Sequence, residues 1–518
     1  ARYRKQRLGR DNPHRNPGTK LRLPKHRLPK RHGKEDDNPD RFHKRIIPVE
    51  RDAEQSRMPP RIFIAVKSLL IWMILSVIPL NEWPPDARLA RRQVDASHEK
   101  YLQKSADPRL IKARPHPALR MVVVIPCHDE PDLVGALERL ANCEPPLGQV
   151  EVIVVINSSE KNSAEVARQN QHTLSQATDW LAGRGNHWLP IHLLHLPDLP
   201  PRHAGVGQAR KIGMDEALRR LADVAQAEDG LLVCYDADCR CSANYFTGIE
   251  SHFAEQSDMP GCSIHFEHPL DADEWAALGF GDRAPVQAVF DGIAAYELHL
   301  RYHVRAQKFI GFPYSFHTIG SAMAVRAWAY VKQGGMNRRQ AGEDFYFLQK
   351  ISWLGQMSVL TGVTVHPSPR LSCRVPFGTG KAVGDYVADG KLTTYPLQAY
   401  RDVQWLLGQV EELWETGKPG SDAPEAMARF LGDEFLESVV PEIRANSGDL
   451  GAFRKRFFRW FNAFRLMKFL NFARDEVHGP AAIEEAAIGL IEWMGLPHPN
   501  SCGIVNLLRQ FRRMEKES

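Results

Sequence analysis

The chain of 518 residues has no CxxC cysteine pair. Its eight cysteines are spread along the sequence, and several stand in apolar runs. A free thiol in such a run packs like a small hydrophobic side chain. The spacing excludes a disulfide framework and indicates a protein that works in a reducing compartment.

Outside residues 1–57, the chain has no excess of basic residues. Those residues hold 18 Lys and Arg against 8 Asp and Glu, so they carry a charge of +10. Of the 67 basic and 62 acidic residues in the whole chain, 49 and 54 remain, which gives −5 for the rest. A mildly acidic folded part removes the main support for nucleic acid as a partner.

Residues 1–57 also lack an apolar period and are rich in Arg, Lys, His, Asn and Pro. Such a segment cannot bury enough apolar surface to fold, so we predict that it is disordered. Three interpretations of it stay open. It is a basic arm for anionic lipid or nucleic acid, a solvated tail, or an over-long gene start, since the first methionine is Met58.

One long apolar run, residues 62–80, contains a single charge, Lys67. Its length suffices for a helix that crosses a bilayer, and the basic flank before it would hold its amino end in the cytoplasm. The segment 58–85 is therefore predicted to be a membrane helix or a helix that lies on a membrane surface.

Farther along, apolar β-branched runs alternate with helical stretches. Runs that are apolar throughout are typical of parallel strands covered on both faces. The sequence predicts strands at 121–126, 150–156, 191–196 and 231–235, and helices at 133–140 and 206–221. This order indicates an α/β fold with a mainly parallel sheet over residues 86–385, with ligands beyond the carboxyl ends of the strands.

After about residue 385 the strand signals stop. Residues 386–518 are predicted to form a helical C-terminal region, with helices at 425–440 and 452–473.

The triplet Asp236-Ala237-Asp238 directly follows the predicted strand 231–235. Two carboxylates at a strand end can hold a hard divalent cation, Mn²⁺ or Mg²⁺, which neutralises a diphosphate leaving group. The alternative is a solvated pair of turn residues, because aspartate favours turns.

A second acidic pair, Glu343-Asp344, follows Gly342 and opens a predicted helix at 344–351. Carboxylates at such a position can simply cap the helix, because its free N–H groups and its dipole attract negative charge. Alternatively, one of them is the general base that takes a proton from an acceptor hydroxyl.

Two further segments offer candidate contacts for a nucleotide. The helix start at 205–213 combines glycines with the positive charges of Arg210 and Lys211, although a plain helix start is an equal alternative. The first strand ends in the polar segment 125–130, which can line a nucleotide pocket or form an ordinary turn.

Taken in order, the segments 125–130, 205–213, 236–238 and 342–344 resemble the motif series of the family-2 glycosyltransferases of the GT-A fold, over roughly residues 120–385. The resemblance implies a GT-A type nucleotide-diphospho-sugar transferase fold and a glycosyltransferase of the hexosyltransferase type. It also implies a nucleotide-sugar donor, a divalent cation (Mn²⁺ or Mg²⁺) and inversion at the anomeric carbon.

The resemblance also implies roles for individual residues. Asp344 matches the catalytic base, with Glu343 beside it near the acceptor. Asp238 matches the direct metal ligand, helped by Asp236. Nucleotide contacts are implied for Pro126, Asp129, Glu130, Arg210, Lys211 and Asp236.

Two departures from the family pattern bear on these expectations. Asn157 follows the second strand where the family usually has an acidic element that touches the base of the donor. Its amide can still hydrogen-bond a base, so the identity of that base stays open. The QxxRW motif of polymer-making members is absent, which favours a non-processive enzyme.

Two histidines and an arginine complete the predicted site. His366 is a candidate third metal ligand, since related enzymes can place a metal-binding histidine in this region; a structural role is the alternative. His317 is expected to face the acceptor, and Arg374 to lie in a glycine-containing loop that closes over the diphosphate.

A cytosolic donor and unpaired cysteines favour a cytoplasmic enzyme at the inner face of the membrane. The expected partners are a nucleotide sugar and a hydroxyl acceptor on a glycan, lipid or small molecule. Two rival functions stay open. One is a nucleotidyltransferase on a similar sheet, although no Gly-rich phosphate loop follows the first strand, and the other is a catalytically silent transferase-like binding protein.

Overall fold

The computed structural model describes the chain from residue 97 onward, apart from short gaps. The described ranges are 97–105, 108–185, 187–281, 283–371, 378–498 and 503–517. The tail 1–57, the apolar segment 62–80 and Arg374 lie outside them, so what the sequence predicts for these residues stays a prediction. Within the described ranges, no helix combines the length and apolar character that a membrane crossing requires.

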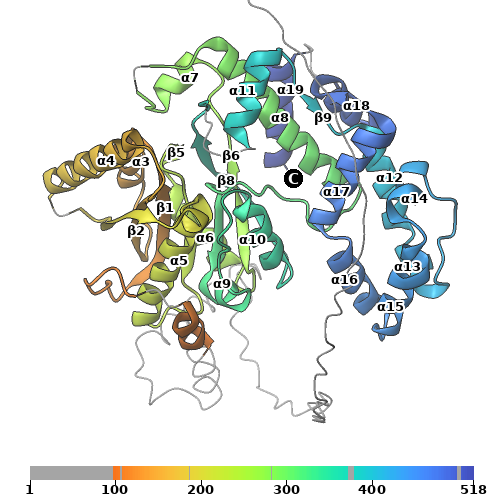
Figure 1. Ribbon diagram of the computed structural model, residues 1–518, viewed down its shortest axis with the longest axis horizontal. Coiled ribbons are helices and arrows are strands. Elements are labelled where there is room, and N and C mark those ends of the chain that lie inside the picture. Colours follow the sequence, from red (N-terminus) through yellow and green to blue (C-terminus); the bar gives the residue numbers. More distant parts are fainter. Residues whose placement is uncertain are drawn as a thin grey trace, which may run out of the picture. The chain divides into compact units, whose positions relative to one another are not determined.

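An eight-stranded sheet forms the centre of the described chain (Figure 1). Its order is β3-β2-β1-β4-β7-β6-β8-β5, and β7 and β5 run against the other strands. The α/β fold with a mainly parallel sheet is therefore confirmed. The strands are β1 (Leu119–Cys127), β2 (Gln149–Ser159), β3 (Ile191–Leu199), β4 (Leu231–Cys234), β5 (Cys239–Cys241), β6 (Gly261–Phe266), β7 (Met323–Arg326) and β8 (Ser358–Pro367).

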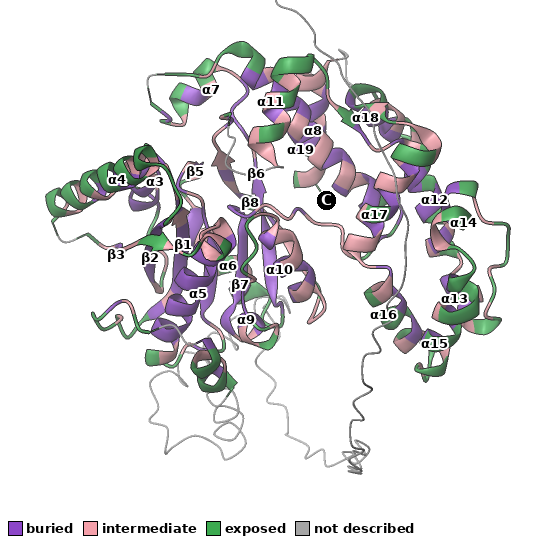
Figure 2. Cartoon of the chain, in the orientation of Figure 1, coloured by how far each residue is buried: buried purple, intermediate pink, exposed green. Residues whose placement is uncertain are grey.

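The central strands are buried on both faces because they are apolar throughout (Figure 2). Side chains alternate along β1, so Val123 and Ile125 join one core while Val122 and Val124 join the core on the opposite face. Helices pack against both cores. Those on the first core are α3 (Leu133–Ala141), α4 (Ala164–Gly183) and α6 (Tyr245–Glu255), and those on the second are α5 (Val206–Asp223), α9 (Ala327–Lys332) and α10 (Glu343–Ser352).

Helix α5 packs very close to the sheet. Gly213 lies against Val124 of β1, and a methyl group at its position would overlap the valine side chain. A helix that connects two parallel strands runs back across the sheet, so the amino end of α5 lies at the carboxyl ends of the strands. This arrangement brings Arg210 to that edge.

Helices α11 (Thr379–Asp389), α18 (Ile483–Trp493) and α19 (Ile504–Lys516) of the C-terminal part pack on the long helix α8 (Gln287–Phe309), and the C-terminal part shares a third core with α8 (Figure 1). Leu298 of α8 belongs to this core together with Leu470 and Leu507. The predicted helical C-terminal region is confirmed. Its other α-helices are α12 (Leu397–Gly408), α13 (Val410–Glu415), α14 (Glu425–Leu431), α15 (Val440–Ala445), α16 (Leu450–Trp460) and α17 (Ala463–Ala473).

Two smaller elements complete the description. A short helix, α7 (Ala272–Ala277), precedes α8, and a two-stranded pair joins β9 (Thr393–Thr394) to β10 (Ala481–Ala482).

Both helices predicted in the C-terminal part are wrong in length, because each is interrupted. In 425–440, α14 ends before Gly432, which has a φ of 62°, and a π-helical turn precedes α15. In 452–473, α16 and α17 separate at Asn462, whose side chain accepts a hydrogen bond from the Arg465 backbone N–H. The left-handed glycine conformation and the asparagine cap end the helices at these points, although the apolar periodicity continues through them.

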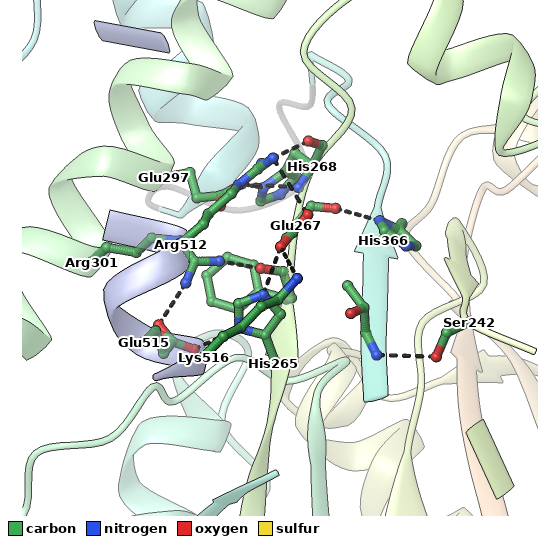
Figure 3. A network of polar contacts seen from close by, with 12 residues as sticks. Ser242, His265, Glu267, His268, Glu297, Arg301, His366, Arg512, Glu515 and Lys516 are labelled. Atoms are coloured by element: carbon green, nitrogen blue, oxygen red, sulfur yellow. Dashed lines mark hydrogen bonds and ion pairs between the residues drawn. The ribbon is translucent and has the colours of Figure 1, made fainter. Parts of the chain in front are cut away.

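A buried network of charged groups joins α19 to α8 and to the sheet (Figure 3). The carboxylate of Glu297 accepts hydrogen bonds from Arg301 Nε at 2.8 Å and from Arg512 Nε and Nη2 at 2.8 and 2.7 Å. The backbone N–H of His268 donates to it at 2.9 Å. Burial opposes the charge of Glu297, but Arg512 and Arg301 outweigh it and hold its pKa well below the ordinary value.

A second buried carboxylate, Glu515, lies near the end of α19. Its oxygens lie 2.9 Å from His317 Nε2, 2.8 Å from His265 Nδ1 and 2.5 Å from Arg301 Nη1. Burial alone would raise the pKa of Glu515, but its partners, His317 first, lower it strongly. The last helix therefore helps to hold His317 in place.

Removing the Glu297 carboxylate should destabilise the protein strongly, because Arg301 and Arg512 would lose the group that offsets their buried charges. We expect Glu297→Ala to lower the free energy of unfolding by about 3–5 kcal/mol. The control Asp385→Ala removes an exposed pair with Lys381 and should cost less than about 1 kcal/mol. Urea unfolding measures both, and equal losses would contradict the assigned role of Glu297.

Candidate active site

The carboxyl ends of β1, β2, β4, β6 and β8 border a cavity of about 1100 Å³. The amino ends of α5 and α10, one face of α8 and part of α17 complete its walls. Parallel strands explain its position, because their carboxyl ends meet at one edge of the sheet. The predicted site residues that line it are Pro126, Glu130, Asn157, Arg210, Asp236, Asp238, His317, Glu343 and Asp344.

Arg210 joins two acidic segments that lie far apart in the sequence. Its Nη2 lies 2.5 Å from Asp236 Oδ1, after β4, and its Nη1 pairs with Glu343 at the start of α10. The side chains of Arg210 and Glu343 are each 3% exposed, whereas that of Asp236 is 34% exposed and stays open to the cavity. Burial would lower the pKa of Arg210, but nearby charges, Asp236 first, raise it instead and keep the guanidinium charged.

A second arginine, Arg370, follows β8 and bridges carboxylates from two other strands. Its Nη2 lies 2.8 Å from Asp238 Oδ2 and also pairs with Glu130, which follows β1. Burial raises the pKa of Glu130, the charge of Asp238 adds to that rise, and Arg370 opposes it. The guanidinium thus allows two carboxylates to share one edge of the cavity.

Asp344 stands in the first turn of α10. Gly342 precedes this helix with a φ of 67°, a conformation that favours glycine, and turns the chain into the helix beside the cavity. Asp344 Oδ1 accepts the backbone N–H of Phe345 at 2.7 Å. Burial raises the pKa of Asp344 and the charge of Arg210 opposes the rise. A carboxylate with a raised pKa is a stronger base than an ordinary aspartate.

Asp236 and Asp238 fit a divalent cation that is shared with a substrate. Arg210 contacts Oδ1 of Asp236 and Arg370 contacts Oδ2 of Asp238, so neither arginine takes the second oxygen of its carboxylate. In the described ranges, no three His, Cys, Asp or Glu side chains form a group that could hold a metal. Two carboxylates suffice when substrate phosphates supply further ligands, which is how proteins commonly bind magnesium.

Asn157 lies near the carboxyl end of β2 and is buried on the cavity wall. Its Nδ2 donates to the Ala204 carbonyl at 2.7 Å, and its own carbonyl lies 2.8 Å from His128 Nδ1. The amide nitrogen therefore fixes the segment before α5, and the side-chain oxygen makes no hydrogen bond within the described residues.

Lys211, predicted to contact the nucleotide, does not line the cavity. Its Nζ donates to Tyr101 Oη at 2.9 Å and to Asp215 Oδ2 at 2.8 Å. These contacts keep the Lys211 ammonium group out of the cavity lining, whereas its sequence neighbour Arg210 is part of that lining.

His366 and Asp129 also lie outside the cavity lining. His366 Nδ1 lies 2.9 Å from the Glu267 carbonyl, and burial lowers the pKa of the ring to about 4. Asp129 has a φ of 51° and donates its backbone N–H to Asn170 Oδ1 at 2.8 Å. Within the described ranges, His366 does not form a three-ligand metal site with Asp236 and Asp238.

No family model and no curated protein sequence matches this chain. Its structure is similar to that of TarS 1-349 from S. aureus in complex with UDP-GlcNAc, with 15% identity, a TM-score of 0.33 and coverage of 73% of this chain and 93% of that chain. It is also similar to the mannosyltransferase PcManGT from Pyrobaculum calidifontis in complex with GDP-Man and Mn²⁺. That match has 12% identity, a TM-score of 0.29 and coverage of 83% of this chain and 96% of that chain. Because these TM-scores are low, function has to be inferred from the cavity itself.

The sequence-based prediction missed several residues that line the cavity. Arg370 follows β8 by three residues, and the valines of that strand could have located its place at the sheet edge from the sequence. His299 and His303 are four positions apart, a spacing that puts them on one face of a helix. Glu515, which holds His317, gave no signal, because 198 positions separate the two residues.

Replacing Arg210 by methionine removes the charge that offsets Asp236 and the buried Glu343. We expect Arg210→Met to lower the free energy of unfolding by about 3 kcal/mol near about pH 7.5. Burial already raises the pKa of Asp236, and losing Arg210 raises it further above the value in the unfolded chain. The cost therefore grows as pH rises above the unfolded pKa, and it should shrink near about pH 4.5.

Urea unfolding at these two pH values measures the effect. Arg429→Met is the control, because Arg429 pairs with Glu425 on the surface and should cost less than about 1 kcal/mol at either pH. A loss for Arg210→Met that does not change with pH would contradict the assigned carboxylate pairing.

Proposed function

We propose that this chain is a glycosyltransferase that moves a sugar from a nucleoside-diphosphate sugar to an acceptor hydroxyl, with the help of a divalent cation. One observation carries the proposal: two acidic segments and two arginines meet in a single cavity. A departing diphosphate requires positive charge, and an attacking hydroxyl requires a base. The residues concerned are Asp236, Asp238, Glu343, Asp344, Arg210 and Arg370.

The diphosphate of the donor is proposed to lie against the ends of β4 and β8. Arg210 and Arg370 supply positive charge there, and a phosphate oxygen can accept from Arg370 in place of Asp238 or Glu130. A Mn²⁺ or Mg²⁺ ion on Asp236 and Asp238, when bound, offsets the charge of the leaving diphosphate. Pro126 and Asn157 line the same cavity and are proposed to contact the nucleoside.

Asp344 is the proposed base. Its carboxylate accepts the proton of the acceptor hydroxyl while the hydroxyl oxygen forms a bond to the anomeric carbon. The bond from that carbon to the diphosphate oxygen breaks, and its electron pair leaves with the nucleoside diphosphate. Attack from the face opposite the leaving group gives inversion. Glu343 holds the start of α10 against Arg210, which positions Asp344 beside the cavity.

The mainly parallel sheet and the order of the four sequence motifs support a GT-A type enzyme similar to family 2, and the missing QxxRW motif supports single additions. The six cysteines in the described ranges are all free and buried, which fits a reducing, cytoplasmic compartment. The apolar segment 62–80 would place the enzyme at the inner face of the membrane.

Asp344→Asn keeps the shape of the side chain but removes the proton acceptor. We expect turnover to fall by about 10²–10⁴-fold, while donor binding persists. Release of nucleoside diphosphate measures turnover, and thermal shifts with nucleotide sugars, in Mn²⁺ and after chelation, measure binding. The donor should stabilise the variant as it does the wild type, and this stabilisation should depend on the metal.

The matched control is Asp223→Asn, because Asp223 forms a surface pair with Arg109 at the far end of α5. It should leave turnover at the wild-type rate. Wild-type turnover in Asp344→Asn would remove Asp344 from the mechanism.

A further inference from the structure

The cavity has two chemically different halves. Its charged lining residues in the described ranges are the arginines and carboxylates at the strand ends and at the starts of α5 and α10. The facing wall is built from α8, the loop after residue 313, α17 and the segment before α12, and no Lys, Arg, Asp or Glu described there reaches the cavity. We call it the neutral wall and define it by Tyr296, His299, His303, Tyr314, His317 and Tyr395.

One face of α8 supplies much of the neutral wall. Tyr296, His299 and His303 are spaced by three and four positions, so they lie along one side of the helix. Glu297 and Arg301, which do not line the cavity, are bonded to each other and to α19 within the buried network (Figure 3). The charges of Glu297 and Arg301 are therefore offset behind the wall.

Each histidine of the neutral wall is held through one ring nitrogen. His299 Nδ1 lies 2.7 Å from Thr394 Oγ1, and His303 Nδ1 lies 2.6 Å from Tyr400 Oη. His317 is held through Nε2 by Glu515. In the described part of the chain, the second nitrogen of each ring has no hydrogen-bond partner, so it is available to a ligand in the cavity.

Burial keeps these rings uncharged where they are deepest. It lowers the pKa of His299 to about 4 and that of His303 to about 3. Burial, and then the charge of Asp344, raise the pKa of Tyr296 to about 12, so the phenol stays protonated. Tyr296 and Asp344 line the same cavity, so the neutral wall and the proposed base share one space.

We propose that the neutral wall is the acceptor subsite and that it takes an uncharged carbohydrate, whose reacting hydroxyl lies at Asp344. This inference rests on the proposed function. Aromatic side chains suit the apolar face of a sugar ring, and imidazole and phenol groups match hydroxyls that both donate and accept hydrogen bonds.

Two other acceptor classes fit this wall poorly. A phosphorylated or carboxylated acceptor would meet no Lys or Arg among the described residues that line this wall and would meet the negative charge of Asp344, so its desolvation would be poorly compensated. A long lipid chain would cover the free nitrogens of His299, His303 and His317 without bonding them, which costs the hydrogen bonds those groups make with water.

The test measures release of nucleoside diphosphate from the donor that stabilises the protein best, with and without acceptors. The acceptors are glucose, N-acetylglucosamine, maltose, the 6-phosphates of the two monosaccharides, glucuronic acid and dodecanol. We expect at least one neutral sugar to accelerate release over hydrolysis in water, and the charged counterparts and dodecanol to have no such effect. Transfer should appear as a new glycoside in the mass spectrum.

His303→Leu removes one hydrogen-bonding nitrogen of the neutral wall and keeps an apolar side chain. It should raise KM for the neutral acceptor by about tenfold, the effect of one lost hydrogen bond, without a matching rise in KM for the donor. His303→Gln keeps a polar group, so its KM for the neutral acceptor should lie between those of the wild type and the leucine variant. This second variant also tests the inference if His303→Leu folds poorly. His252→Leu, at a half-buried histidine bonded to Ser358 outside the cavity, is the matched control and should keep the wild-type constants.

Stimulation by the phosphorylated or uronic sugars, or by dodecanol alone, would overturn the inference while leaving the proposed function intact. Donor hydrolysis that no neutral sugar accelerates would do the same. Failure of every nucleotide sugar to bind or to be hydrolysed would instead overturn the proposed function, and the inference with it.

Discussion

The buried guanidinium of Arg210 ties the end of β4 to the start of α10, and the arrangement of the cavity depends on this contact. Asp236 and Glu343 are more than a hundred positions apart. The Glu343 carboxylate is buried and costly unless a cation offsets it, whereas Asp236 stays open to the cavity and pairs with the same guanidinium. Arg210 both links the two segments and offsets the buried charge of Glu343. As a result, Arg210 fixes the position of Asp236, a proposed metal ligand, relative to Asp344, the proposed base.

The same logic of compensated burial extends to the opposite side of the cavity. Helix α8 faces α19 with Glu297 and Arg301 and faces the cavity with Tyr296, His299 and His303. Because Glu297 is paired with Arg301 and Arg512, this part of the helix lines the cavity with uncharged side chains while its charges are offset on the other side. The C-terminal helices are therefore part of the site's construction, since they complete the pairing that keeps one wall neutral.

Much of the sheet was accessible from sequence because β1, β2, β3 and β4 are apolar runs followed by polar residues, and their carboxyl ends locate Asp236 and Glu130. The helix start at Gly342 located Asp344 in the same way. What the sequence could not show is which distant groups meet. Lys211 turns to Asp215 while its neighbour Arg210 enters the cavity, and Glu515 reaches His317 from the last helix. Two predicted helices are interrupted at Gly432 and Asn462, because the pattern of apolar residues does not reveal local helix caps.

Phosphorus NMR of a reaction that contains the protein, a metal ion and a nucleotide sugar tests the central claim most directly, because it identifies which phosphorus-containing product leaves. Cleavage between the anomeric carbon and the diphosphate oxygen predicts signals of a nucleoside diphosphate that grow as the donor disappears, faster when a hydroxyl acceptor is present. Signals of a sugar 1-phosphate and a nucleoside monophosphate would show attack at the α-phosphorus, the attack that a nucleotidyltransferase makes, and would contradict the account of the site given by Arg210, Asp236 and Asp344.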